Sequence, residues 1–195
     1  MSPQSVRAED PDKRQAILSA ALELFVERGY YGTAVPAVAD RAGVGAGTIY
    51  RYFRSKEDLV NTLYRQCKKE LATHVLLGIA PDAPPREQFH QFWVRLAAFA
   101  RKSPRIFSFL ELHHHVSYLD DDSRAMQQRV LDLATSFIVG LQAAKVVKPI
   151  SAEVIMAIVY WSFVGLARCE QEGRLTLDDK SLADAEQCVW EAIRY

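Results

Sequence analysis

The 195-residue sequence has few cysteines, no net charge and none of the short motifs that mark common enzyme classes. Its three cysteines, Cys67, Cys169 and Cys188, are far apart and odd in number, which argues against a disulfide scaffold or a zinc knuckle. We expect buried free thiols, with redox sensing as the alternative. The GxSxG, HExxH, GxxxxGK(S/T) and GxGxxG patterns are all missing. We therefore predict no catalytic residue, cofactor or metal site, and no enzyme.

Long apolar segments are also scarce. No apolar run is expected to reach the length of a membrane span, and the opening MSPQSVRAEDPDK lacks the hydrophobic core of a signal peptide. A cytoplasmic protein without a membrane partner is therefore expected. With 49% hydrophobic residues, the chain can still bury one or two substantial cores.

What the sequence does contain is a succession of helical patterns. Asp10 is a suitable N-cap, Pro11 suits the first helical position, and apolar residues then repeat at helical spacing as far as Gly29. A long amphipathic helix follows Ser55 and ends near Gly78. Only helical periods occur after residue 89. The prediction is an all-α fold of about nine helices, with a disordered segment at 1–10, a first domain at 11–57 and a second helical domain at 58–195.

The segment TAVPAVADRAGVGAGTIYRYFRSK, from Thr33 to Lys56, has the pattern of a helix-turn-helix. Its apolar residues fit two short helices, about 34–41 and 46–52, joined at Gly43, which can take the left-handed conformation of a tight turn. Thr33 is the expected N-cap of the first helix and Gly45 of the second. The second helix of such a motif can enter the DNA major groove. A plain helical hairpin inside a core is the alternative, because periodicity alone does not separate the two.

The charges around this segment favour a nucleic-acid partner more than the net charge does. From Arg41 to Lys69 there are seven basic residues against Glu57 and Asp58, a local excess of five. A basic surface of this kind neutralises phosphates. A solvated helix face is the alternative for the last three of these basic residues.

The run GVGAGTIYRYFRSKEDL, preceded by KRQAILSAALELFVERGYYGTAV, resembles the DNA-binding domain of the TetR/AcrR family of bacterial transcriptional regulators. The resemblance covers about residues 13–65 and is carried by the register of Gly43, Gly47, Thr48, Tyr50, Phe53 and Lys56. It implies that the second helix of the motif reads the bases and that its flanks hold the DNA backbone. The expected base-proximal residues are Gly45, Ala46, Gly47, Thr48, Tyr50 and Arg51, and the expected backbone-holding residues are Thr33, Tyr52 and Lys56.

Two positions depart from the pattern of that family. Members commonly have Ser and a basic residue where this sequence has Gly45 and Ala46, which offer no polar side chain to a base. Arg51 can form a bidentate pair with guanine, so Arg51, the tyrosines and DNA shape are expected to specify the site.

The resemblance also implies a homodimer. The segment 151–172 is apolar around much of its girth, more than one core face can use, and contains small residues that permit close helix approach. We expect the last two helices, 151–172 and 181–194, to form a four-helix bundle across a two-fold axis; a buried monomeric core helix is the alternative. The expected interface residues are Ala157, Val164, Gly165, Arg168, Val189 and Ala192.

An effector pocket in the C-terminal helices is the remaining implication. Aromatic residues are dense there, although an aromatic stripe is more often core than pocket. The histidines at 113–115 point about 100° apart on a helix, so they do not share one ligand. Glu111 and a nearby histidine have metal-ligand spacing, but surface histidines are the simpler interpretation, and we predict no metal. The expected pocket residues are Phe89, Phe92, Trp93, Phe107, Glu111, His114, Tyr118, Phe137 and Trp161.

These patterns together predict a DNA-binding transcriptional regulator. The expected form is a dimeric repressor that binds a palindromic operator and is released by a small-molecule effector of unspecified class. The alternatives are an activator with the same mode of DNA binding, and a helical bundle that binds a small molecule or a partner without specific DNA binding.

Overall fold

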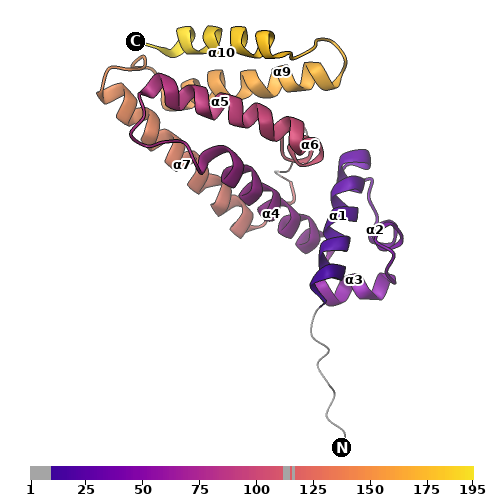
Figure 1. Ribbon diagram of the computed structural model, residues 1–195. Coiled ribbons are helices and arrows are strands. Elements are labelled where there is room, and N and C mark those ends of the chain that lie inside the picture. The colour runs from indigo at the N-terminus through magenta and orange to yellow at the C-terminus, as the bar shows by residue number, and fades with distance from the viewer. Residues whose placement is uncertain (1–9, 112–114, 116) are drawn as a thin grey trace, which may run out of the picture.

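The computed structural model describes residues 10–111, 115 and 117–195, and these residues are helical without a β-strand. An isolated bridge between Val147 and Arg194 is the only strand-like pairing among them. The predicted all-α fold is therefore confirmed. The three N-terminal helices form a unit at one end of the molecule, and the other helices stack beside one another in the rest (Figure 1).

The N-terminal unit consists of α1 (Pro11–Arg28), α2 (Val35–Arg41) and α3 (Ala46–Tyr52). The Asp10 side chain accepts from the backbone N–H of Asp12, and Gly29 ends α1 with a φ of 69°, both as predicted. One N-cap prediction is wrong, because the residue that caps α2 is Ala34 and not Thr33.

Helix α4 (Lys56–Leu76) leaves the N-terminal unit and continues into the rest of the molecule (Figure 1). Its predicted start is confirmed, since the Ser55 hydroxyl accepts from the backbone N–H of Asp58. Helix α5 (Pro85–Lys102) packs along α4, and α6 (Pro104–Glu111) packs on both α1 and α4. A continuous core joins these helices, so the two parts share buried contacts.

The C-terminal part adds α7 (Asp121–Ala143), α8 (Ala152–Met156), a π-helical turn η1 (Ala157–Trp161), α9 (Ser162–Gln171) and α10 (Asp179–Ile193). The acidic run at 120–122 follows a segment whose apolar period predicts a short helix, so the sequence alone suggests that the run ends that helix. It starts α7 instead, with Asp120 as the N-cap, because a carboxylate satisfies free N–H groups of a first turn. Likewise Asp178 caps α10, which begins earlier than predicted.

The continuous helical run Ala152–Gln171 is long and apolar enough to cross a membrane by length and composition, with a mean hydropathy of 1.5. The expectation that no segment reaches this length is therefore wrong. Only 22% of its most apolar stretch is buried inside the chain. In a single copy of the protein, Val154, Ala157, Trp161 and Gly165 of this run are exposed.

Candidate nucleic-acid interface and cavity

The turn between α2 and α3 has the geometry that a helix-turn-helix requires. Gly43 adopts a φ of 67°, and the backbone N–H of Val44 donates to the carbonyl of Ala39 across 3.0 Å. Val38 and Ile49 are completely or almost completely buried, so they fix α2 and α3 on the core of the N-terminal unit. The opposite side of α3 therefore faces outward.

Most of the predicted base-proximal residues lie on that outward side. Gly45, Ala46, Gly47 and Arg51 are exposed, as is Tyr50, whose exposed fraction is 57%. Thr48 is half-buried. The structure thus places these residues together on one short helix and its N-terminus.

The predicted backbone-holding residues lie in three different environments. The Thr33 side chain is buried, and its hydroxyl is 3.0 Å from the carbonyl oxygen of Leu24 and 2.8 Å from that of Gly29, so it donates within its own unit. Tyr52 is half-buried, and its hydroxyl accepts from the backbone N–H of Asp10 across 3.1 Å. Thr33 therefore has a structural role inside the unit, whereas the Tyr52 hydroxyl accepts one hydrogen bond and can still donate one.

Lys56 is held above an aromatic ring. Its Nζ lies 4.2 Å from the ring centre of Tyr30, and partial burial lowers the pKa of this lysine. The Tyr30 hydroxyl donates to Glu57 across 2.6 Å. This packing positions the lysine next to the end of α3.

Several of the basic residues that the sequence places around the motif are neutralised by carboxylates in the folded chain. Arg41 is paired with Glu23 at 2.9 Å and Glu27 at 3.3 Å, and the next pairs along the chain are Arg65 with Asp120 and Lys68 with Glu111. No carboxylate forms an ion pair with Arg51, Arg54 or Lys56 within the described ranges. These three side chains therefore provide the uncompensated positive charge beside α3.

A groove of about 560 Å³ runs from the C-terminal end of α3 to the start of α7. It places three basic residues opposite three acidic ones, so it is not uniformly positive. Its lining consists of Tyr50, Arg51, Tyr52, Phe53, Arg54, Asp58, Arg65, Asp120 and Asp122.

Helix α6 connects the N-terminal unit directly to the C-terminal helices. The Phe109 ring on α6 stacks on the Phe25 ring of α1, with centroids 6.3 Å apart. The Glu23 carboxylate lies 3.2 Å from Arg105 of α6 and 2.9 Å from Arg41 of α2. A displacement of α6 therefore acts on both α1 and α2.

A second contact between the two parts involves the aromatic residues that follow α1. The rings of Tyr30 and Tyr118 stack with centroids 4.2 Å apart, and the Tyr31 hydroxyl donates to Ser117 across 3.1 Å. Tyr118 was predicted as a pocket residue. Its ring instead stacks on Tyr30, the residue whose ring also contacts Lys56.

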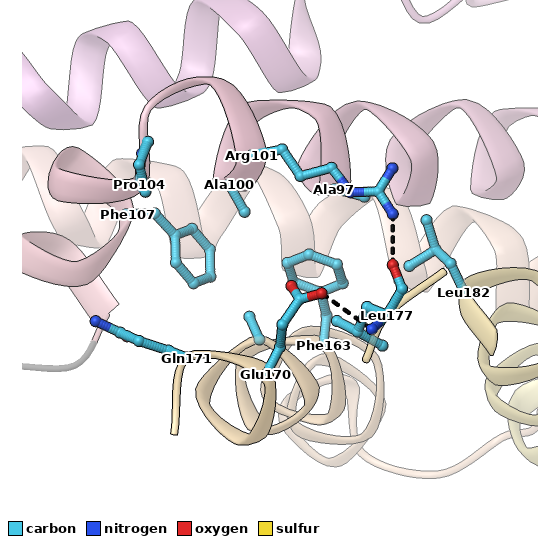
Figure 2. Close-up of a pocket in the computed structure, with 11 residues that line it drawn as sticks. Ala97, Ala100, Arg101, Pro104, Phe107, Phe163, Glu170, Gln171, Leu177 and Leu182 are labelled. Carbon is cyan, nitrogen blue, oxygen red and sulfur yellow. Dashed lines mark hydrogen bonds between the residues drawn. The ribbon is translucent and has the colours of Figure 1, made fainter. Parts of the chain in front are cut away.

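A cavity of about 260 Å³ lies between α5, α6, α9 and α10 (Figure 2). Its walls are mostly apolar, and its polar groups surround Leu177. Arg101 donates to the Leu177 carbonyl across 2.7 Å, and the Leu177 N–H donates to Glu170 across 2.9 Å. The lining residues are Ala97, Ala100, Arg101, Pro104, Phe107, Phe163, Ala167, Glu170, Gln171, Leu177 and Leu182.

Of the predicted pocket residues that the structure describes, Phe107 alone lines this cavity. Phe89 and Phe92 are half-buried against the core, and Trp93 is fully buried, with its Nε1–H donating to the Leu182 carbonyl. Sequence reasoning missed Arg101 and Glu170, for which there is no local signal. Glu111 pairs with Lys68, and Phe137 and Trp161 are exposed, so these three lie elsewhere. The prediction for His114 falls outside the described residues.

The predicted interface residues divide into two groups. Ala157, Gly165, Arg168 and Ala192 are exposed. Val164 and Val189 are instead buried in the core of the chain itself, so their side chains are not part of its surface. The helical period identified apolar positions without separating an internal from an external apolar face.

The cysteines and acidic residues give no indication of a metal site. No group of three His, Cys, Asp or Glu side chains suited to a metal ion occurs in the part of the chain that the structure describes. Cys67 is buried, which raises the pKa of its thiol to about 12, whereas Cys169 is half-buried and Cys188 is exposed. The prediction of buried thiols is therefore correct for Cys67 and wrong for Cys188.

Comparison with known sequences relates both parts of the chain to one family. Residues 17–63 match the bacterial regulatory proteins of the tetR family, and residues 64–195 match the tetracyclin repressor-like C-terminal domain. HTH-type transcriptional regulator YhgD of Bacillus subtilis is 23% identical over 88% of this chain and 91% of its own length. HTH-type transcriptional repressor KstR2 of Mycobacterium tuberculosis is 42% identical over 60% of this chain and 54% of its own length.

Solved structures have the same fold. A TetR family protein from Vibrio parahaemolyticus is 28% identical and superposes with a TM-score of 0.77, covering 94% of this chain and 99% of that one. Transcriptional regulator FadR from Bacillus subtilis, solved in complex with stearoyl-CoA, has a TM-score of 0.68 at 18% identity, covering 91% of this chain and 95% of its own. Together with the exposed α3 and the two matched domains, these relationships establish that the chain belongs to the TetR family and is a DNA-binding transcriptional regulator.

Proposed function

We propose that this regulator is a homodimeric repressor that binds a palindromic operator through α3 and is released by a small-molecule effector. The observation that carries the proposal is the exposed outer side of α3, where Arg51 has no carboxylate partner among the described residues. Because a repressor of this kind works on bacterial DNA, the proposal includes a cytoplasmic location.

Base recognition in this proposal depends on few side chains. The exposed Gly45, Ala46 and Gly47 allow the backbone to approach the DNA closely but offer no polar side chain. Arg51 can form a bidentate pair with guanine, while Thr48 and Tyr50 can contact a thymine methyl or a phosphate. Lys56 and Tyr52 then hold the DNA backbone beside these contacts.

The proposed dimer covers the apolar surface that one chain leaves exposed. On α7, Val130, Leu133 and Phe137 recur at i, i+3 and i+7, with exposed fractions of 40%, 69% and 53%. On the run α8–η1–α9, the exposed positions Val154, Ala157, Trp161, Gly165 and Arg168 form a second stripe.

Helices α7 and α8 pack on each other, so two copies can bring four helices together at a two-fold axis. Expected contact residues are Leu133, Phe137 and Trp161 together with the predicted Ala157, Gly165 and Arg168. The predicted Ala192, on α10, is the least supported contact, because none of the exposed large apolar side chains of the described residues lies on α10.

Release requires a ligand with unequal affinity for two states of the dimer. An effector that binds more tightly when the two α3 helices are misplaced for successive major grooves shifts the population toward free protein. FadR of Bacillus subtilis was solved with stearoyl-CoA, and KstR2 is described as a repressor, which supports ligand-controlled repression here.

The test is selection of bound DNA from a random duplex library at moderate salt, followed by sequencing. The expected result is a palindrome with half-sites about one helical turn apart. Absence of any enriched sequence would instead support a helical bundle that binds a small molecule or a partner without specific DNA recognition.

A substitution in α3 tests whether Arg51 recognises a base. Arg51→Ala should weaken binding by about 1–3 kcal/mol on the selected palindrome and should relax the preference at one base pair in each half-site. An equal loss on every duplex sequence would show that Arg51 contacts phosphate and does not read a base.

A further inference from the structure

The cavity between α5, α6, α9 and α10 is half open to solvent and is lined mostly by apolar side chains. Here Ala97, Ala100 and Ala167 leave a space of about 260 Å³ in front of the Phe107 and Phe163 rings. These rings meet edge to face, with centroids 5.9 Å apart, so the apolar wall is rigidly packed.

The size of the cavity limits what it can hold. Pockets for drug-sized ligands occupy roughly 300–1,000 Å³, and this one, at about 260 Å³, is smaller. A molecule with about one ring or a short branched chain is therefore the appropriate size.

The polar groups of the cavity determine which ligand chemistry fits. Figure 2 shows Glu170 projecting from α9 toward the space between the two phenylalanine rings, with one oxygen accepting from the Leu177 N–H. A carboxylate accepts several hydrogen bonds, so it can also accept one from a ligand. Arg101 extends from α5 to Leu177, and its guanidinium donates to the Leu177 carbonyl. The guanidinium also lies 3.3 Å from the Asp179 carboxylate.

We propose that this cavity is the effector site and that the effector is a small, mostly apolar molecule with one hydrogen-bond-donating group, an amine or a hydroxyl, which faces Glu170. The inference rests on the proposed function and names the ligand class of that regulator. An anionic ligand is disfavoured, because its charge meets the Glu170 carboxylate while the Arg101 guanidinium is engaged at Leu177.

The position of α6 gives the ligand a physical route to the DNA-binding unit. Phe107 faces the cavity, whereas Arg105 and Phe109 of the same short helix contact Glu23 and Phe25 of α1. A ligand that shifts α6 therefore changes the support of α1. The coupling is reciprocal, so DNA must weaken ligand binding by the same factor by which the ligand weakens DNA binding.

The experiment is calorimetric titration of the full-length protein, without DNA, with four probes of similar shape. These are 2-phenylethylamine, 2-phenylethanol, ethylbenzene and phenylacetate. The amine and the alcohol should bind, ethylbenzene should bind about tenfold to a hundredfold more weakly because it donates no hydrogen bond, and phenylacetate should not bind.

Matched variants assign the binding to this cavity. Ala100→Leu should abolish binding of the amine because the larger side chain fills the space, whereas Ala98→Leu, at an exposed position of the same helix, should leave it unchanged. Ala167→Leu repeats the test from the opposite wall if Ala100→Leu does not fold. Glu170→Gln should weaken the amine at least tenfold and the alcohol less, since it removes a charge but keeps an acceptor.

Binding that survives both cavity-filling variants, or no binding of any probe, would overturn the inference. An amine that binds but does not change the affinity for the selected palindrome would overturn the effector assignment. The two proposals can fail separately, because the titration uses no DNA. If no probe binds but the selection still enriches a palindrome, only the assignment of the cavity is wrong. If the probes bind but the selection enriches no palindrome, only the proposed repressor function is wrong.

Discussion

The N-terminal unit and the C-terminal helices differ in whether one chain completes their packing. In α1–α3 the apolar face of each helix is buried in a shared core, and the outward side of α3 has small and polar residues around Tyr50. Helix α7 is longer than α1, yet its only buried residues are Ser123 and Ile138, while five large apolar side chains are exposed. The comparison indicates that the DNA-binding unit is packed within one chain, whereas α7 leaves an apolar surface that the proposed dimer would cover.

The largest expected effect comes from disrupting the exposed stripe on α7. Leu133→Asp should convert the protein into a folded monomer, because Leu133 is 69% exposed and contributes little to the core of its own chain. The affinity for the palindrome should fall about 10²- to 10⁴-fold, since the second half-site is no longer linked to the first. Sedimentation equilibrium measures the mass, and fluorescence anisotropy measures the affinity.

Val139→Asp is the matched control for this substitution. Val139 is also apolar and exposed on α7, but it lies on a different side of the helix from the stripe of Leu133 and Phe137. It should remain dimeric. A dimeric Leu133→Asp protein would show that the chains associate through another surface.

A smaller effect is expected at the edge of the DNA-binding unit. Lys56→Ala should weaken binding to all duplex sequences alike and should reduce the slope of log K against log salt by about one per subunit, because one phosphate contact is lost. Lys69→Ala, which removes the same charge from an exposed position further along α4, should leave the slope unchanged. Loss restricted to the selected palindrome would instead give Lys56 a role in base recognition.

The smallest effect is expected inside the unit. Thr33→Val removes a buried hydroxyl that donates to backbone carbonyls, so the free energy of unfolding should fall by about 1 kcal/mol while DNA affinity below the transition is unchanged. Denaturant titration measures the first quantity and anisotropy the second. Thr176→Val, at an exposed position, is the control for stability. Unchanged stability with weaker DNA binding would restore Thr33 as a phosphate contact.

The sequence predicted the N-terminal unit well because its signals are local. The Asp10 and Ser55 caps, the Gly43 turn and the bounds of α3 each depend on residues a few positions apart. The prediction of Thr33 as a cap failed because tertiary packing buried its side chain, and its hydroxyl then found partners at the end of α1.

The sequence predicted the C-terminal surfaces less well for a physical reason. A helical period shows that one face is apolar but not whether that face meets the core of its own chain or another molecule. Phe137 and Trp161 were therefore interpreted as pocket residues although both are exposed, and Val164 as interface although it is buried. The cavity was missed because folding, and not sequence proximity, brings Arg101 and Glu170 to the lining of one cavity.

The most direct test of the account is the mass and affinity of the wild-type protein on the selected palindrome and on a duplex with one half-site. We expect two chains on the palindrome and binding to the half-site that is about 10²- to 10⁴-fold weaker. A single chain that binds both duplexes with equal affinity would contradict the account, because the exposed helices α7 and α8–α9 would then have no role in DNA recognition.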